Sequence, residues 1–160
     1  HIAAHGFDAV ELFATRTHFD YHDLQAVAHM ADWLSDTRLE LHSLHAPICE
    51  GLKSGQWIGS FSNASGDATR RAAALAETHA ALQVARLIPY RFLVVHLGVP
   101  AARQQPLGDN QPDAARRSLE EIVTMAADVG VRVAVEVIPN QLSGAVELVR
   151  LIEDHFEGVD

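Results

Sequence analysis

Short apolar runs alternate along this chain with longer segments in which apolar residues recur every three or four positions. The short runs predict buried strands, and the longer period predicts amphipathic helices. The expected strands cover residues 8–13, 39–46, 91–97 and 131–138. The expected helices cover residues 21–36, 67–88, 112–130 and 143–158, and Asp20 is the expected N-cap of the first.

This β–α alternation predicts a parallel sheet whose strands are joined by right-handed crossovers. The strands are apolar on both faces, as expected where helices cover both sides of a sheet, or where helices cover one side and a barrel interior the other. A doubly wound sheet and a (β/α) barrel both fit four such units. The chain shows no linker, so we expect one domain over residues 1–160, and both ends resemble cuts within a longer barrel.

Each predicted strand carries an ionisable residue near its carboxyl end, on matching positions of the two-residue alternation. These residues are Glu11, His45, His96 and Glu136. A charge or imidazole beside a buried apolar run is costly unless something there uses it. In α/β enzymes the chemistry lies at this end of the sheet. Because every strand contributes a residue, the pattern favours the barrel over the doubly wound sheet, which usually gathers its chemistry at one switch point.

Imidazole nitrogens and carboxylate oxygens are the donors that Zn²⁺, Mn²⁺ and similar ions select. We therefore expect His45, His96 and Glu136 to converge as metal ligands with positions left open for substrate. The alternative is that each residue caps its strand by bonding loop backbone. For Glu11, a helix N-terminus or an arginine partner would explain the carboxylate equally well. Alternation points His42 to the opposite face, where it is expected to pack beneath a helix.

The segment 48–66 is long for a strand-to-helix connection, and such loops often cover or bind substrate. Its Trp57 and Phe61 are candidates for covering a substrate, or they pack on the barrel rim. Arg70 and Arg71 follow at the start of the next helix, within reach of a phosphate or as solvated surface charges. Gly98, after His96, allows either a tight turn or close approach of a ligand to the backbone.

Composition narrows the class of partner. The chain has 160 residues and a formal net charge of -9, which disfavours nucleic-acid binding because phosphate backbones are repelled. Its one cysteine, Cys49, permits no internal disulfide, which suits a reducing compartment such as the cytoplasm. No apolar run approaches ~20 residues, so no transmembrane helix is expected.

Four segments resemble, in order and spacing, the second to fifth strands of the xylose isomerase-like TIM-barrel superfamily, which includes sugar-phosphate isomerases and epimerases and endonuclease IV-type enzymes. They are residues 6–12, 44–47, 94–98 and 133–136. The resemblance implies a (β/α)8 barrel, present here as about four β/α units. It also implies that Glu136 is a metal ligand and, in the isomerase branch, moves a proton at carbon.

In the endonuclease-like branch the resemblance makes His45 and His96 zinc ligands, whereas in isomerases these positions more often contact substrate. The run Glu136-Val-Ile-Pro-Asn140 departs from the Glu-Asn-Thr run of endonuclease IV. We therefore expect a divalent-metal isomerase or epimerase of sugars or sugar phosphates, using Mn²⁺, Mg²⁺, Co²⁺ or Zn²⁺, with Glu11, His45, His96 and Trp57 contacting substrate. The alternatives are a zinc phosphodiesterase and a non-catalytic barrel. Each of these functions is compatible with a homo-oligomer.

Overall fold

The computed structural model describes residues 2–103 and 108–156. A parallel sheet of four strands forms its centre, in the order β1 (Ala9–Phe13), β2 (Glu40–His45), β5 (Phe92–His96) and β6 (Arg132–Glu136). The α-helices are α1 (Leu24–Thr37), α2 (Ala68–Gln83), α3 (Pro112–Ala127) and α4 (Ala145–His155). Short 3-10 helices lie at η1 (Ala3–His5), η2 (Val84–Arg86) and η3 (Ala101–Arg103). The predicted four β/α units are confirmed.

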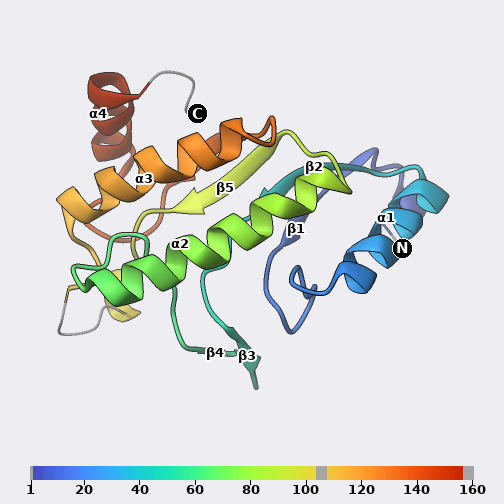
Figure 1. Cartoon of the computed structure of the whole chain (residues 1–160), viewed down its shortest axis with the longest axis horizontal. Helices are drawn as coiled ribbons and strands as arrows, with labels where there is room; N and C mark the ends of the chain where they lie inside the picture. The colour runs from blue at the N-terminus through green and yellow to red at the C-terminus, as the bar shows by residue number, and fades with distance from the viewer. Residues whose placement is uncertain (1, 104–107, 157–160) are drawn as a thin grey trace.

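Neighbouring strands of the sheet are also consecutive β/α units in the sequence. Right-handed crossovers between consecutive parallel strands carry the helices to the same face, as in a barrel wall. Figure 1 shows α2 and α3 running side by side across the sheet. The sheet residues facing the helices form the core and are nearly all inaccessible to solvent: Val10, Leu44, Leu93, Val95 and Val133. The other face is the inner face of the barrel wall.

The segment after β2 folds into a small hairpin rather than the continuous loop that its composition suggested. Strands β3 (Gly51–Lys53) and β4 (Gln56–Ile58) pair antiparallel and project away from the sheet in Figure 1. The two-residue turn uses Ser54 and Gly55, both with positive φ (50° and 74°). Positive φ at both positions matches the twist of a two-residue hairpin. The Ser-Gly pair was the signal available in the sequence.

Helix α1 begins three residues later than predicted. Asp23, not Asp20, is its N-cap, and its carboxylate accepts a hydrogen bond from the amide of Gln25. Asp20 instead accepts from the amide of His22 in the preceding turn. Both aspartates suit a cap, so sequence alone did not separate them. Within the described ranges, no helix is long and apolar enough to cross a membrane.

A β-bulge interrupts the pairing of β1 with β2. Val10 pairs with Leu41 and Glu11 with Ser43, which leaves His42 as the extra residue. The bulge changes the alternation, so Leu41 and Ser43 lie on opposite faces of the sheet. The prediction that His42 packs beneath a helix is wrong, because its side chain is exposed and its ring lies 5.4 Å from that of Phe92.

Candidate metal centre

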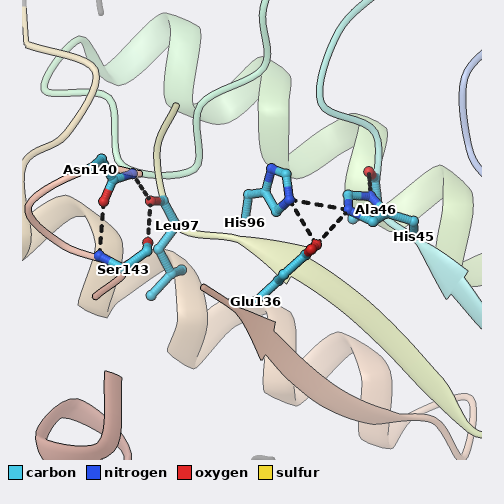
Figure 2. Close-up of polar contacts among 7 residues, drawn as sticks. All are labelled: His45, Ala46, His96, Leu97, Glu136, Asn140 and Ser143. Carbon is cyan, nitrogen blue, oxygen red and sulfur yellow. Dashed lines mark hydrogen bonds and ion pairs between the residues drawn. The ribbon is translucent and has the colours of Figure 1, made fainter. Parts of the chain in front are cut away.

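Three side chains meet on the inner face where β2, β5 and β6 end. His45, His96 and Glu136 are the last residues of these strands. His96 pairs with Glu136 in the ladder, and His45 pairs with Val94, one inner-face position earlier. The shared polarity of the parallel strands therefore brings residues 51 and 40 positions apart in sequence to one point. Figure 2 shows the three groups converging.

The converging atoms are close enough to surround one small ion. His96 Nε2 lies 2.9 Å from Glu136 Oε2, and His45 Nε2 lies 3.1 Å from the same oxygen. The two Nε2 atoms are 3.2 Å apart. Among the described residues, these three form the one group of potential metal ligands, with all ligand atoms within 4.8 Å of one another.

The tautomer of His45 follows from its second nitrogen. Nδ1 lies 2.8 Å from the carbonyl oxygen of Ala46, which can only accept, so Nδ1 carries the proton. With the imidazole neutral, His45 Nε2 therefore presents a lone pair to Glu136 and His96. Only His96 Nε2 can then supply a proton, and one proton cannot satisfy all three contacts. A cation at the centre would satisfy them, so the residues fit a divalent metal ion.

The exposed fraction of the side chain increases from His45 through His96 to Glu136. The side chain of His45 is 2% exposed and that of Glu136 is 47% exposed. Burial, and then the electrostatic interaction with His45, lower the pKa of His96, against the opposing effect of Glu136. Burial alone would raise the pKa of Glu136, but its hydrogen bonds and charge interactions with the two histidines outweigh it, and the pKa lies below its ordinary value. A neutral His96 and an ionised Glu136 are the forms that bind a metal.

Phe13 is a part of the site that sequence reasoning missed. It ends β1, pairs with His45 in the ladder, and stacks on the imidazole with ring centroids 4.3 Å apart and an interplanar angle of 11°. The stack and the Nδ1 hydrogen bond together fix the orientation of His45. The alternation Glu11, Phe13 on the strand facing Ser43, His45 was the signal that could have identified it.

Glu11 lies two residues deeper than the cluster along the same face. Its carboxylate accepts a hydrogen bond of 2.6 Å from the hydroxyl of Ser43, its partner in the ladder. This partner is neither the arginine nor the helix N-terminus that the sequence left open. The ligand group of three does not include Glu11.

The remaining candidates lie in the loops around the sheet. Trp57, on β4, contacts Arg103, whose guanidinium lies 4.3 Å from the ring centroid, so the hairpin touches η3 after β5. Arg70 and Arg71 are paired with carboxylates, at 2.7 Å from Asp109 and 3.2 Å from Glu121 respectively. Neither arginine is therefore the free cation that a phosphate site would need.

Gly98 forms a turn immediately after His96. Its φ is 84°, and a Cβ there would lie 2.1 Å from the Oδ1 of Asn110. Of the two uses left open by the sequence, the structure shows the turn. This turn directs the chain away from the cluster after His96.

Comparisons with known proteins agree with this geometry. A family model described as a xylose isomerase-like TIM barrel matches residues 1–156. No curated protein matches the chain in sequence. The structure of D-psicose 3-epimerase in the presence of D-fructose is similar, with 22% identity, a TM-score of 0.73, and coverage of 99% of this chain and 54% of that one.

Two further structures are similar at lower identity. The 3-keto-D-glucoside 4-epimerase from E. coli has 16% identity and a TM-score of 0.72, with 99% of this chain and 59% of that one covered. A xylose isomerase-like TIM-barrel protein from Mycobacterium smegmatis in complex with magnesium has 14% identity and a TM-score of 0.69, with 99% and 52% covered. These likenesses establish the fold, and the chain spans about half the length of the chains it resembles.

Proposed function

Because this chain belongs to the xylose isomerase-like TIM-barrel family, we propose that it acts in the divalent-metal-dependent isomerisation or epimerisation of sugars or sugar phosphates. The similar structures include two sugar epimerases, which supports this class of substrate. We also propose that its four β/α units correspond to the second to fifth units of the barrel, within one domain over residues 1–160.

His45, His96 and Glu136 would hold the metal, and their mutual distances of 2.9–3.2 Å are the observation that carries the proposal. A bound divalent ion would act as a Lewis acid toward neighbouring oxygens of a ketose or aldose. Magnesium in a similar structure supports a divalent ion, with Mn²⁺, Co²⁺ and Zn²⁺ as the other candidates.

Glu136 is the proposed catalytic residue. Its side chain is the most exposed of the three and its pKa lies below the ordinary value, so its carboxylate is ionised at neutral pH and reachable by substrate. It would take the proton from the carbon next to the carbonyl. His45 and His96 would orient the substrate beside it. Glu11 and Trp57 remain predicted substrate contacts, one deeper on the inner face and one on the hairpin.

The test combines metal titration with isotope exchange. The chain, freed of metal by chelation, is titrated with Mn²⁺, Mg²⁺, Co²⁺ and Zn²⁺, and then incubated with ketohexoses and their phosphates in D₂O. We expect one ion per chain and metal-dependent deuterium incorporation next to the carbonyl. Glu136→Gln should abolish the incorporation, and unchanged incorporation would refute its role.

A second candidate is a zinc phosphodiesterase of the endonuclease IV kind. The observation in its favour is that two of the three donors are imidazoles, which zinc prefers. Two or three zinc ions per intact protein chain and cleavage of an abasic DNA strand would support it. Failure to retain any metal would instead favour a barrel that has no catalysis.

A further inference from the structure

Asn140 uses all of its hydrogen-bonding groups to join two loops. It lies four residues after Glu136, in the connection from β6 to α4. Its Nδ2 donates to the carbonyl oxygens of Leu97 (3.0 Å) and Val99 (3.1 Å). Its Oδ1 accepts from the amides of Leu142 and Ser143, both at 2.8 Å. Two donors and two acceptor sites are the full capacity of an asparagine side chain.

The carbonyl oxygens that Asn140 reaches belong to the turn that begins directly after His96. Leu97 and Val99 are buried. The hydroxyl of Ser143 also donates to the carbonyl of Leu97, at 2.9 Å. Figure 2 shows this network beside the His96–Glu136 contact. The chain leaving Glu136 is therefore bonded to the chain leaving His96, within a few residues of both ligands.

This connection begins where the sheet ends. The ladder between β5 and β6 stops at the His96–Glu136 pair. Beyond it, the two loops are joined by the Asn140 and Ser143 side chains and by a backbone bond from Ala101 to Pro139 of 2.9 Å. The last pair of a ladder is free to fray unless the chain beyond it is held.

We propose that Asn140 is a positioning residue that sets the separation of His96 and Glu136 and so determines the affinity of the site for its metal. The inference rests on the proposed metal site. The connection that Asn140 makes between the two loops can be measured without a metal. Asn140 touches neither ligand side chain and acts through backbone. Asn140 is the last residue of the run Glu136-Val-Ile-Pro-Asn140, which departs from the Glu-Asn-Thr run of endonuclease IV.

The chain offers a matched control in Asn110. This asparagine is fully buried, whereas Asn140 is part-buried. Like Asn140, it donates to the carbonyl of Val99, at 3.0 Å, and it accepts from the Val99 amide at 2.8 Å. Asn110 lies in the same β5–α3 connection as Val99. Its bonds to Val99 therefore hold one loop to itself, whereas those of Asn140 join the two loops.

The experiment compares Asn140→Ala with Asn110→Ala in the whole chain. Affinity for Co²⁺ is measured from the ligand-field absorption spectrum, and stability from urea unfolding without metal. Both variants should lose stability, because each removes two hydrogen bonds to buried backbone groups of Leu97 or Val99. Asn140→Ala should weaken Co²⁺ binding by about 10- to 100-fold, the range for residues that support metal ligands. Asn110→Ala should keep its affinity within about threefold, well below that range.

Equal weakening in the two variants, or wild-type affinity in Asn140→Ala, would overturn the proposal. If Asn140→Ala does not fold, Ser143→Ala removes one bond to Leu97 and should give a smaller loss of affinity in the same direction. If the unmodified chain binds no metal, the proposed function fails. Amide hydrogen exchange then tests whether Asn140 holds the two loops together. Faster exchange at residues 137–143 in Asn140→Ala, but not in Asn110→Ala, would then support it, and equal exchange would overturn it.

Discussion

Replacing Glu136 by glutamine should separate metal binding from folding. The change removes the negative charge and one of three donors but keeps the size of the side chain. In the metal-free chain the carboxylate is 47% exposed, and contacts at that exposure contribute about 0–1 kcal/mol. The free energy of unfolding without metal should therefore change by no more than about 1 kcal/mol.

The effect of metal on stability should be much larger. At a metal concentration 100 times Kd, binding to the folded state alone stabilises it by about 2.7 kcal/mol. For a chain of 160 residues this corresponds to a rise in Tm of roughly 5–11 °C. Loss of a ligand should weaken binding by at least about 100-fold, since loss of a supporting residue already costs about 10- to 100-fold. The same metal concentration then adds only about 0.4 kcal/mol, or roughly 1–2 °C.

The assay is thermal unfolding followed by circular dichroism, with Mn²⁺ or Zn²⁺ and with chelator. Glu11→Gln is the charge-matched control, because this carboxylate lies on the same face but is bonded to Ser43. It should keep the full metal-dependent rise in Tm. The reasoning is refuted if Glu136→Gln shows the same rise as the unmodified chain, or if both glutamate variants lose it equally.

Three further predictions concern the support of the site and the fold. Phe13→Ala should weaken metal binding by about tenfold, because the ring stacks on His45, and should change the free energy of unfolding by less than about 1 kcal/mol, because the ring is 48% exposed. Metal titration and urea unfolding of the variant check this, and an unchanged metal affinity would contradict it. Leu44→Ala should cost about 2–5 kcal/mol in urea unfolding, because the side chain is fully buried; a loss below about 1 kcal/mol would be incompatible with its place in the core. The carboxylate of Glu77 accepts hydrogen bonds from Tyr21 (2.5 Å) and His22 (2.8 Å), which outweigh the effect of burial and hold its pKa below 4.5. The ionised Glu77 carboxylate therefore stabilises the fold above pH 4.5, and this stabilisation is lost as pH falls through the lower folded-state pKa. The free energies of unfolding of Glu77→Gln and the unmodified chain, measured in urea at several pH values, should therefore converge below pH 4.5. A difference that stays constant with pH would argue against this role.

The order and type of the main elements could be predicted because their signals are local. Periods of two and of three to four residues mark strands and helices wherever the chain folds around one core. Pro112 begins α3 as predicted, since proline suits the first helical turn. The boundary of α1 was less certain, because Asp20 and Asp23 are both good caps and only tertiary packing selects between them.

The predicted convergence of the strand-end residues depended on parity, and parity is only as reliable as the register. It identified His45, His96 and Glu136, because β5 and β6 pair regularly up to their last residues and β2 is regular from Ser43 to His45, after its bulge. It could not identify Phe13 as the partner of His45, because that requires knowing which strands are neighbours and how they are aligned. Nor could the role of Asn140 be predicted from the sequence, because its hydrogen bonds cross from one loop to another.

The extra residue in β2 has a consequence for which changes this strand can tolerate. A regular strand would place Leu41, Ser43 and His45 on one side, so either the leucine would leave the apolar interior or the histidine would turn away from Glu136. Inserting His42 lets the first half of the strand serve the packing and the second half serve the chemistry. Deleting that single exposed histidine should therefore be more damaging than replacing it, because deletion forces a choice between a filled core and an assembled cluster.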